Sequence, residues 1–441
     1  MAKKKQVIFS GDWMGMHPYQ SSAPTDLYYV KLANRIYEAA DVLFLSEAYH
    51  KLYLDEDEKK RFCCTLTAYF EDIISQTGIF TAFTRECLKR TGKPLPFYTC
   101  EDYAEDEINT CDLQFIIWHF FMQLDETNIP YSPLDPLFTQ LATTVMQILD
   151  AEYETAPENE KLKKFFLQPN LTSRNIENWF SRIFWTGSES YLFQENGLRL
   201  QIDADDTVDM AKKENMEDRI PEMINMLCND FAYNNVTEFF ALRPAQWLSR
   251  ILGKSVPVYE CLDSLSRKYS GYFRYIEEKE THTRFTHIAT GKEIEITNRS
   301  LIGFPPEMKN ENRILFFGIV KWDNDWWLVG EARSYDGSEE LADEITGQEE
   351  EYHLFDEKEE LPENEQEIIL NDILTDTQDE EGEPLSPTEV AWIALKSDEL
   401  GKSFFKNAYL NNRIPELAFE GENGKILIKE NLDFMLDYIK R

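Results

Sequence analysis

The chain has 441 residues, more than a single hydrophobic core usually organises, so two or three domains are expected. Hydrophobic residues make up 42% and aromatic residues 13% of the sequence, which excludes a chain that is disordered throughout. The net charge is −36, and residues 336–383 carry 20 of these negative charges, because they hold 21 acidic residues and one basic residue, Lys358.

The sequence predicts a cytoplasmic protein without membrane segments. Its longest apolar run, Leu113 to Met122, is about half the length that crosses a bilayer. The apolar stretch from Gln6 to Ser10 is too short for the core of a signal peptide. The seven cysteines are an odd number and are scattered without a C-x-x-C pair. We therefore expect reduced, mostly buried thiols and neither a metal nor another cofactor.

Residues 1–202 are predicted to form a helical domain. Apolar residues recur at steps of three and four, the period of one helical face, in residues 27–44 and again from Phe62 to Ile73. The segment Leu113 to Leu124 is apolar nearly all round, which predicts a central, buried helix. Prolines then break the chain before a further helix from about 137 to 154.

A polar stretch, residues 203–218, separates this domain from an α+β module predicted for residues 219–333. The module begins with helices, after which the period changes to two. Hairpin turns are expected around Gly291 and around Asn324. Five short strands favour a small antiparallel sheet or a partly open barrel. The expected strands are Tyr269–Glu278, Thr283–Ile288, Glu293–Thr297, Arg313–Lys321 and Trp326–Ala332.

Residues 334–386 are predicted to form an acidic, largely disordered linker, because few aromatic residues interrupt the charges. Beyond it, residues 387–441 are expected to form helices that dock onto the body. The predicted fold class is therefore α+β: a helical N-terminal domain, a small antiparallel sheet or partly open barrel, an acidic linker and C-terminal helices.

Short signatures of catalysis are largely absent, since there is no phosphate-binding glycine loop, no G-x-S-x-G and no H-E-x-x-H. Glu47 and His50 form an E-x-x-H of the kind that di-metal helical bundles use. The other E-x-x-H, residues 350–353, lies in the acidic linker, so we prefer a solvated helix face to a metal site. Glu71 and Asp72 are adjacent, but Glu71 falls outside the apolar stripe of its helix, which predicts surface charges.

Asp112 and His119 lie on one stripe of the predicted buried helix, about 10 Å apart along its axis, too far for a direct contact. Together with the acidic residues 105–107 they could still form a polar pocket, since histidine is easily poised near neutral pH. We prefer the interpretation that His119 is a core histidine with its hydrogen bonds satisfied.

The predicted strands carry the most promising binding pattern. Residues 267–299 hold seven basic and five acidic residues, so this part of an acidic chain is locally basic. Basic groups that hold phosphates, interleaved with aromatic rings that stack on bases, are what single-strand nucleic-acid binding on a small barrel requires. Against this, alternating aromatic residues are ordinary in strands, and the glutamates repel a phosphate backbone. The candidate binding residues are Arg274, Arg284, His287, Lys292, Tyr272 and Tyr275.

Several short blocks, spread over almost the whole chain, resemble a known family. They are Asp12-Trp13 with His17-Pro18-Tyr19, Tyr69-Phe70-Glu71-Asp72-Ile73-Ile74 with Thr77-Gly78-Ile79, Leu95-Pro96-Phe97-Tyr98, Asp106-Glu107-Ile108-Asn109, and Asn431-Leu432-Asp433-Phe434-Met435. The family they resemble is an uncharacterised domain-of-unknown-function family found mainly in gut Bacteroidetes. The resemblance implies a bacterial, cytoplasmic origin and brings no assigned reaction, so no functional residue is carried over from it.

These observations favour an interaction or regulatory protein that binds a macromolecular partner through the acidic linker and the β module. The partner is expected to be a protein, with nucleic acid as the second choice because of the overall charge. The linker could bind a basic protein, compete with nucleic acid for one, or shield the locally basic strands in cis. The alternative is an enzyme of unrecognised type, with unidentified catalytic residues in a polar pocket of the N-terminal helices.

Overall fold

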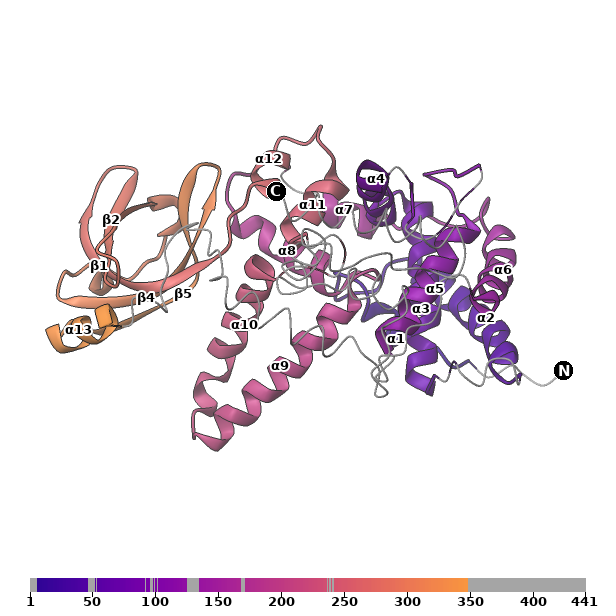
Figure 1. Ribbon diagram of the computed structural model, residues 1–441, viewed down its shortest axis with the longest axis horizontal. Helices are drawn as coiled ribbons and strands as arrows, with labels where there is room; N and C mark the ends of the chain where they lie inside the picture. Colours follow the sequence, from indigo (N-terminus) through magenta and orange to yellow (C-terminus); the bar gives the residue numbers. More distant parts are fainter. Residues whose placement is uncertain are drawn as a thin grey trace, which may run out of the picture.

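The computed structural model describes residues 6–347, with gaps at 47–51, 53, 92, 96–97, 99, 101, 125–134, 168–170, 236, 238 and 240–241. A helical part and a β-rich part lie side by side in it (Figure 1). Three predictions lie outside the described residues: the E-x-x-H at Glu47 and His50, the acidic linker after residue 347, and the helices of residues 387–441.

Helices form the described chain up to residue 263, as the sequence predicts. They are α1 (Ser10–Met14), α2 (Asp26–Phe44), α3 (Glu56–Ser75), α4 (Ile79–Thr91), α5 (Thr110–Leu124), α6 (Pro136–Asp150), α7 (Glu160–Leu167), α8 (Glu177–Ser188), α9 (Gln194–Lys213), α10 (Ile220–Asn234), α11 (Pro244–Leu252) and α12 (Tyr259–Asp263).

Helix α3 is the centre of the helical part. The Asp55 side chain accepts hydrogen bonds from the backbone N–H groups of Asp57 and Glu58, both at 2.8 Å, and the Glu58 side chain accepts from Asp55 N at 2.7 Å. This capping box satisfies backbone donors at the start of the helix. Helices α1, α2, α4, α5 and α7 all pack against α3. The predicted apolar stripe from Phe62 to Ile73 is therefore buried, and so is most of the opposite face.

Helix α5 is the predicted central helix, and its burial is confirmed, with Phe115 and Trp118 fully shielded from solvent. Helices α9 and α10 form a pair that projects from the body between the two parts (Figure 1). The polar stretch 203–218 is the second half of α9 followed by a 3₁₀ turn, Glu217–Arg219. The domain boundary expected at residue 202 thus falls inside a helix whose polar residues face solvent.

The predicted strands are present, with ends that differ by four residues at most: β1 (Tyr269–Glu278), β2 (His282–His287), β3 (Glu293–Thr297), β4 (Arg313–Trp322) and β5 (Asp325–Asp336). Pairing among the described strands follows the order β1-β2-β3-β5-β4, and β4 returns to β1. All pairs are antiparallel except β3 with β5, which meet in parallel at a single registered pair, Ile296 and Trp326. The sheet is thus mixed and strongly curved, and β3 and β5 are joined only at this one pair. This agrees with the predicted partly open barrel.

Turn chemistry explains the hairpins. Asp323 and Asn324 both have positive φ, 51° and 66°, as a two-residue type I′ turn requires between β4 and β5. Gly291, with φ 67°, serves the turn between β2 and β3. Register shifts after Tyr275 in β1 and after Phe316 in β4 add the local twist that lets a small sheet curl. Both predicted hairpins are confirmed.

The β part has its own core and a second one outside the sheet. The inner core is formed by Phe273, Phe285, Ile294, Ile296, Leu301, Leu315, Phe317, Ile319 and Leu328. Helix α13 (Glu339–Gly347) covers part of the outer face, where Ile345 is buried with Ala289 and Ile314. The segment predicted as a linker from residue 334 therefore begins with the end of β5 and with α13.

The two parts are packed together through α10 and the turn between β4 and β5. Nε1 of Trp322 donates to the carbonyl of Arg174 at 2.9 Å, and Trp322 belongs to the core of the helical part. Nζ of Lys268 lies 2.8 Å from Oδ1 of Asp230 on α10. In the residues that the structure describes, no helix has the length and apolar character to cross a membrane.

Candidate functional site

The prediction that Glu71 and Asp72 are surface charges is wrong. Both residues are buried, and each is only 1% exposed. The helical period of α3 identified its most apolar stripe, but five other helices surround α3 and bury its polar side as well. A buried carboxylate must be paired or hydrogen-bonded, so the surroundings of both residues decide what they do.

Glu71 is held by a histidine from the N-terminal segment. Its Oε2 lies 2.7 Å from Nε2 of His17, and its Oε1 accepts a hydrogen bond from Nδ2 of Asn159 at 2.9 Å. Nδ1 of His17 lies 2.9 Å from the carbonyl oxygen of Trp13, so both ring nitrogens face acceptors. Burial lowers the pKa of His17, but the charge and hydrogen bond of Glu71 outweigh it and raise the pKa above 6.5. The geometry therefore favours the imidazolium form.

A second carboxylate, Asp26, extends this network. Its Oδ1 accepts from Nε1 of Trp13 at 3.1 Å and from the hydroxyl of Tyr19 at 2.9 Å, and its Oδ2 accepts from Ala23 N at 2.6 Å. The network ties α1, α2, α3 and the start of α7 together. Its members that belong to the blocks resembling a known family are Trp13, His17, Tyr19 and Glu71.

Asp72 caps the next helix. Its carboxylate accepts hydrogen bonds from the backbone N–H groups of Ile79 at 3.1 Å and Phe80 at 2.8 Å, the first residues of α4. The hydroxyls of Thr77 and Tyr191 donate to it as well. Burial raises the pKa of Asp72, and these four donors oppose that shift. Asp72 therefore caps α4 from the neighbouring helix α3, and it also fixes the residues before α4.

Asp112 and His119 do not meet in a pocket. Oδ2 of Asp112 accepts from the Tyr69 hydroxyl at 2.7 Å, while Oδ1 is buried with no hydrogen-bond partner among the described residues. Burial raises the pKa of Asp112 to about 7. His119 is 5% exposed and packs edge-on against the rings of Phe115 and Phe239, so its prediction as a core histidine is confirmed. The acidic group upstream points elsewhere, since Glu105 pairs with Arg85.

The six candidate residues of the β part are not brought together as one exposed patch. His287 has no exposed surface, and its Nε2 lies over Gly271, where a Cβ would come within 2.6 Å of it. Burial, with the charge of Lys292, lowers the pKa of His287 to about 4, so this ring is neutral at pH 7. Arg284 is engaged by two carboxylates, Glu277 at 3.0 Å and Glu293 at 3.3 Å.

The aromatic candidates are used for packing. Tyr272 contacts the rings of Phe316 and Tyr335 beneath α13, and Tyr275 packs against the inner core of the barrel. Nε of Arg274 is buried without a hydrogen-bond partner among the described residues, whereas Lys292 is exposed at its hairpin turn. The role of these residues in binding stays a prediction, and their geometry gives it little support.

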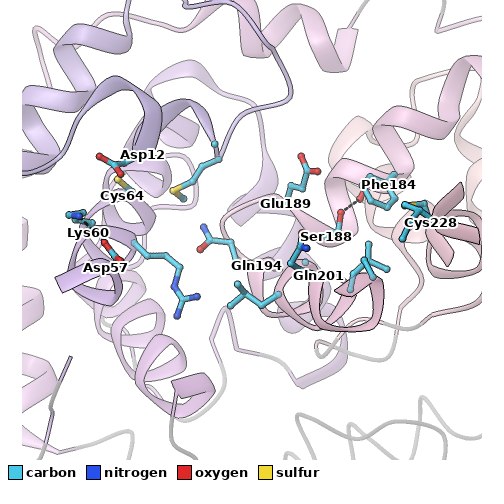
Figure 2. A pocket seen from close by; sticks show the side chains of 18 residues that line it. Asp12, Asp57, Lys60, Cys64, Phe184, Ser188, Glu189, Gln194, Gln201 and Cys228 are labelled. Carbon is cyan, nitrogen blue, oxygen red and sulfur yellow. Dashed lines mark hydrogen bonds and ion pairs between the residues drawn. The ribbon is translucent and has the colours of Figure 1, made fainter. Parts of the chain in front are cut away.

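A cleft of about 630 Å³ opens elsewhere, between α1 and α3 on one side and α8, α9 and α10 on the other (Figure 2). Gly197 lets α9 approach the end of α8, because a Cβ there would lie 2.3 Å from the carbonyl oxygen of Ser188. Nδ2 of Asn196 donates to the carbonyl of Gly187 at 3.0 Å and fixes the same corner. The apolar lining includes Met16, Phe184, Leu198 and Ile224.

Charged groups stand on opposite walls of the cleft. Lys60 and Asp57 lie on the α3 wall and form an ion pair of 2.8 Å, and Asp12 lies near them. Glu189 stands on the α8 wall across the cleft (Figure 2), where desolvation raises its pKa. Two polar side chains in the lining, Arg61 and Gln194, have donors without acceptors among the described residues.

Sequence reasoning missed Arg61, Glu189 and Gln194. They lie on α3, after α8 and at the start of α9, so no short motif contains them. One local signal was available: Arg61 directly precedes Phe62, the first residue of the apolar stripe, which places a guanidinium beside a buried face. None of Asp112, His119 or residues 105–107, the centre of the predicted enzyme pocket, lines this cleft.

A family described as "Protein of unknown function (DUF3843)" matches residues 7–273, more than half of the chain. The match covers the helical part and ends in β1, and the C-terminal block of the resemblance lies beyond it. No curated protein and no solved structure matches the chain. The resemblance to a domain-of-unknown-function family is confirmed, and the chain belongs to the family DUF3843.

Proposed function

We propose that this chain is a cytoplasmic binding protein whose helical part holds a small organic molecule in the cleft. The observation that carries the proposal is a concave site of about 630 Å³ that combines apolar side chains with charged groups and contains one buried donor without a partner among the described residues, Nε2 of Gln194. Small-molecule sites typically have volumes of about 300–1,000 Å³, so the cleft has a suitable size. Binding is favoured over catalysis, because the buried carboxyls Glu71, Asp72 and Asp112 lie in networks outside the cleft.

The test uses the neutral fluorescent probe phenylnaphthylamine (NPN), whose emission rises in an apolar site. Ala204 lines the cleft from α9, so Ala204→Phe should fill part of it and weaken NPN binding about tenfold or more. Ile202→Phe is the matched control, since Ile202 is 61% exposed on the same helix and does not line the cleft. Equal NPN affinity in both variants and in the parent chain would exclude the cleft as the binding site.

A second candidate function is favoured by the position of α13. This helix carries acidic residues and lies over Tyr272, one of the candidate binding residues, as a shield in cis would. If α13 left the sheet, it would uncover this surface. The surface would then bind a macromolecule with exposed rings or anionic groups. A basic protein partner for the remaining acidic residues, 348–386, is a proposal that rests on charge alone.

Ile345→Asp tests this second candidate, because it places a charge under α13 where Ile345 is 2% exposed. Thr346→Asp adds the same charge at the exposed neighbouring position and serves as the control. Fluorescence anisotropy with labelled oligothymidine should show salt-sensitive binding for Ile345→Asp alone. If neither variant binds oligothymidine, the shielding hypothesis is wrong.

A further inference from the structure

Arg61 presents a charged group to the cleft that the described protein does not neutralise. Its guanidinium stacks 5.4 Å from the ring centroid of Phe120, and no carboxylate lies within ion-pair distance of it among the described residues. Burial lowers the pKa of Arg61, while the more distant charges of Glu58, Asp55 and Glu195 oppose this shift. Arginine nonetheless stays protonated at neutral pH. A partly buried cation without a counter-ion is unfavourable, so the site is suited to an anion.

Gln194 places a second donor in the wall of the same cleft. Its Nε2 is shielded from solvent and has no acceptor among the described residues, whereas its Oε1 lies 3.5 Å from the hydroxyl of Thr65. This long contact leaves the N–H groups of the amide in the wall of the cleft without an acceptor among the described residues. Arg61 comes from α3 and Gln194 from the start of α9, so helices far apart in the sequence bring both residues to the same cleft.

The other charged groups of the lining restrict what can bind. Lys60 is already paired with Asp57, which leaves Arg61 as the cation without a partner in the described lining. Asp12, Asp57 and Glu189 would repel a ligand that carries many negative charges. One anionic group beside Arg61 and Gln194, attached to an apolar body that reaches Phe184 and the other apolar side chains, satisfies all these constraints.

We propose that the cleft binds a small organic anion whose carboxylate or phosphate is held by Arg61 and Gln194 and whose apolar body lies along the wall of α8, α9 and α10. This inference rests on the proposed small-molecule function and adds the class of ligand. Arginine suits either group, because its planar guanidinium donates two parallel hydrogen bonds to a carboxylate or a phosphate.

The experiment compares NPN with anilinonaphthalene sulfonate (ANS), which adds an anionic group to the same ring system. The full-length protein should bind ANS about tenfold more tightly than NPN. Arg61→Met keeps the apolar stem over Phe120 and should remove this preference while NPN affinity stays within about threefold. Arg61→Lys keeps the charge and should retain most of the preference.

Arg85→Met is the matched control, since Arg85 is a 60%-exposed arginine on α4 that pairs with Glu105 and does not line the cleft. It should leave the affinities for both probes unchanged. Competition of ANS with naphthoate and with naphthyl phosphate then distinguishes a carboxylate ligand from a phosphate ligand. Suppose that NPN binds in the cleft, but that Arg61→Met either weakens the binding of both probes equally or changes the binding of neither. The anion site is then wrong and the proposed function stands. If NPN itself fails to bind, both are wrong.

Discussion

Nε2 of His17 lies 2.7 Å from Oε2 of Glu71, although 54 residues separate them in the sequence and neither side chain is more than 2% exposed. The other ring nitrogen of His17 faces the carbonyl oxygen of Trp13. A carbonyl can only accept a hydrogen bond, so the pair is best described as an imidazolium held against a carboxylate in the interior. Removal of either charge should therefore be costly.

Glu71→Gln removes the counter-charge of His17, so the buried ring must either release its proton or remain charged without a carboxylate beside it. Loss of one partner from a buried pair typically costs about 3–5 kcal/mol, and we expect a decrease of that size in the free energy of unfolding at pH 7. Glu160→Gln is the control, since the Glu160 side chain is 66% exposed and its loss should change stability by less than about 0.5 kcal/mol. Urea denaturation measures both. Similar losses in the two variants would contradict the buried pair.

The stability contributed by His17 should depend on pH with a defined sign. Because the folded state raises the pKa of His17 above 6.5, the folded chain keeps a proton that the unfolded chain releases. This contribution is complete below about pH 6.5 and is lost as the pH rises through the raised pKa. The difference in unfolding free energy between the parent chain and His17→Gln should then shrink toward alkaline pH. A difference that stays constant from about pH 6 to pH 9 would exclude this assignment.

The stability contributed by Asp112 should also depend on pH, in a lower pH range than that of His17. Burial raises its pKa from 3.8 to about 7, so the folded state holds a proton across this range that the unfolded state has lost. Stability from this group therefore falls as the pH rises from 3.8 to about 7. Asp112→Asn stays neutral and should gain up to about 4 kcal/mol relative to the parent chain over that interval. Denaturation midpoints at several pH values measure the gain, and a parallel pH course in both proteins would refute it.

Asp72→Ala should be among the most destabilising substitutions on α3. It removes the cap of α4 and leaves the N–H groups of Ile79 and Phe80 without their acceptor in the interior. A lost cap costs about 1 kcal/mol and each unsatisfied buried group about 1–3 kcal/mol, so a total of roughly 3 kcal/mol or more is expected. The control is Asp209→Ala, whose side chain is 66% exposed. If thermal unfolding shifts no more for Asp72→Ala than for this control, the capping role is wrong.

The β part shows how far local patterns reach. Alternating residues and the turn residues Gly291, Asp323 and Asn324 predicted every described strand, because hairpin pairing depends on neighbours that are close in the sequence. The parallel contact of Ile296 with Trp326 was not predicted, since it joins strands that no hairpin connects. The burial of His287 depends on its packing against Gly271 and Phe273 of the neighbouring strand, so the pattern of basic and aromatic residues suggested more exposure than the sheet allows.

The helical part shows what local sequence patterns cannot predict. The sequence by itself determined which segments become helices and that α5 is buried, because helical period and apolar content are properties of one segment. Only the tertiary structure decided that Glu71 meets His17, that Asp72 caps α4, and that Arg61 and Gln194 share a cleft. These contacts join residues from separate helices, and the packing of those helices is set by many weak contacts across the whole core rather than by any single stretch of sequence.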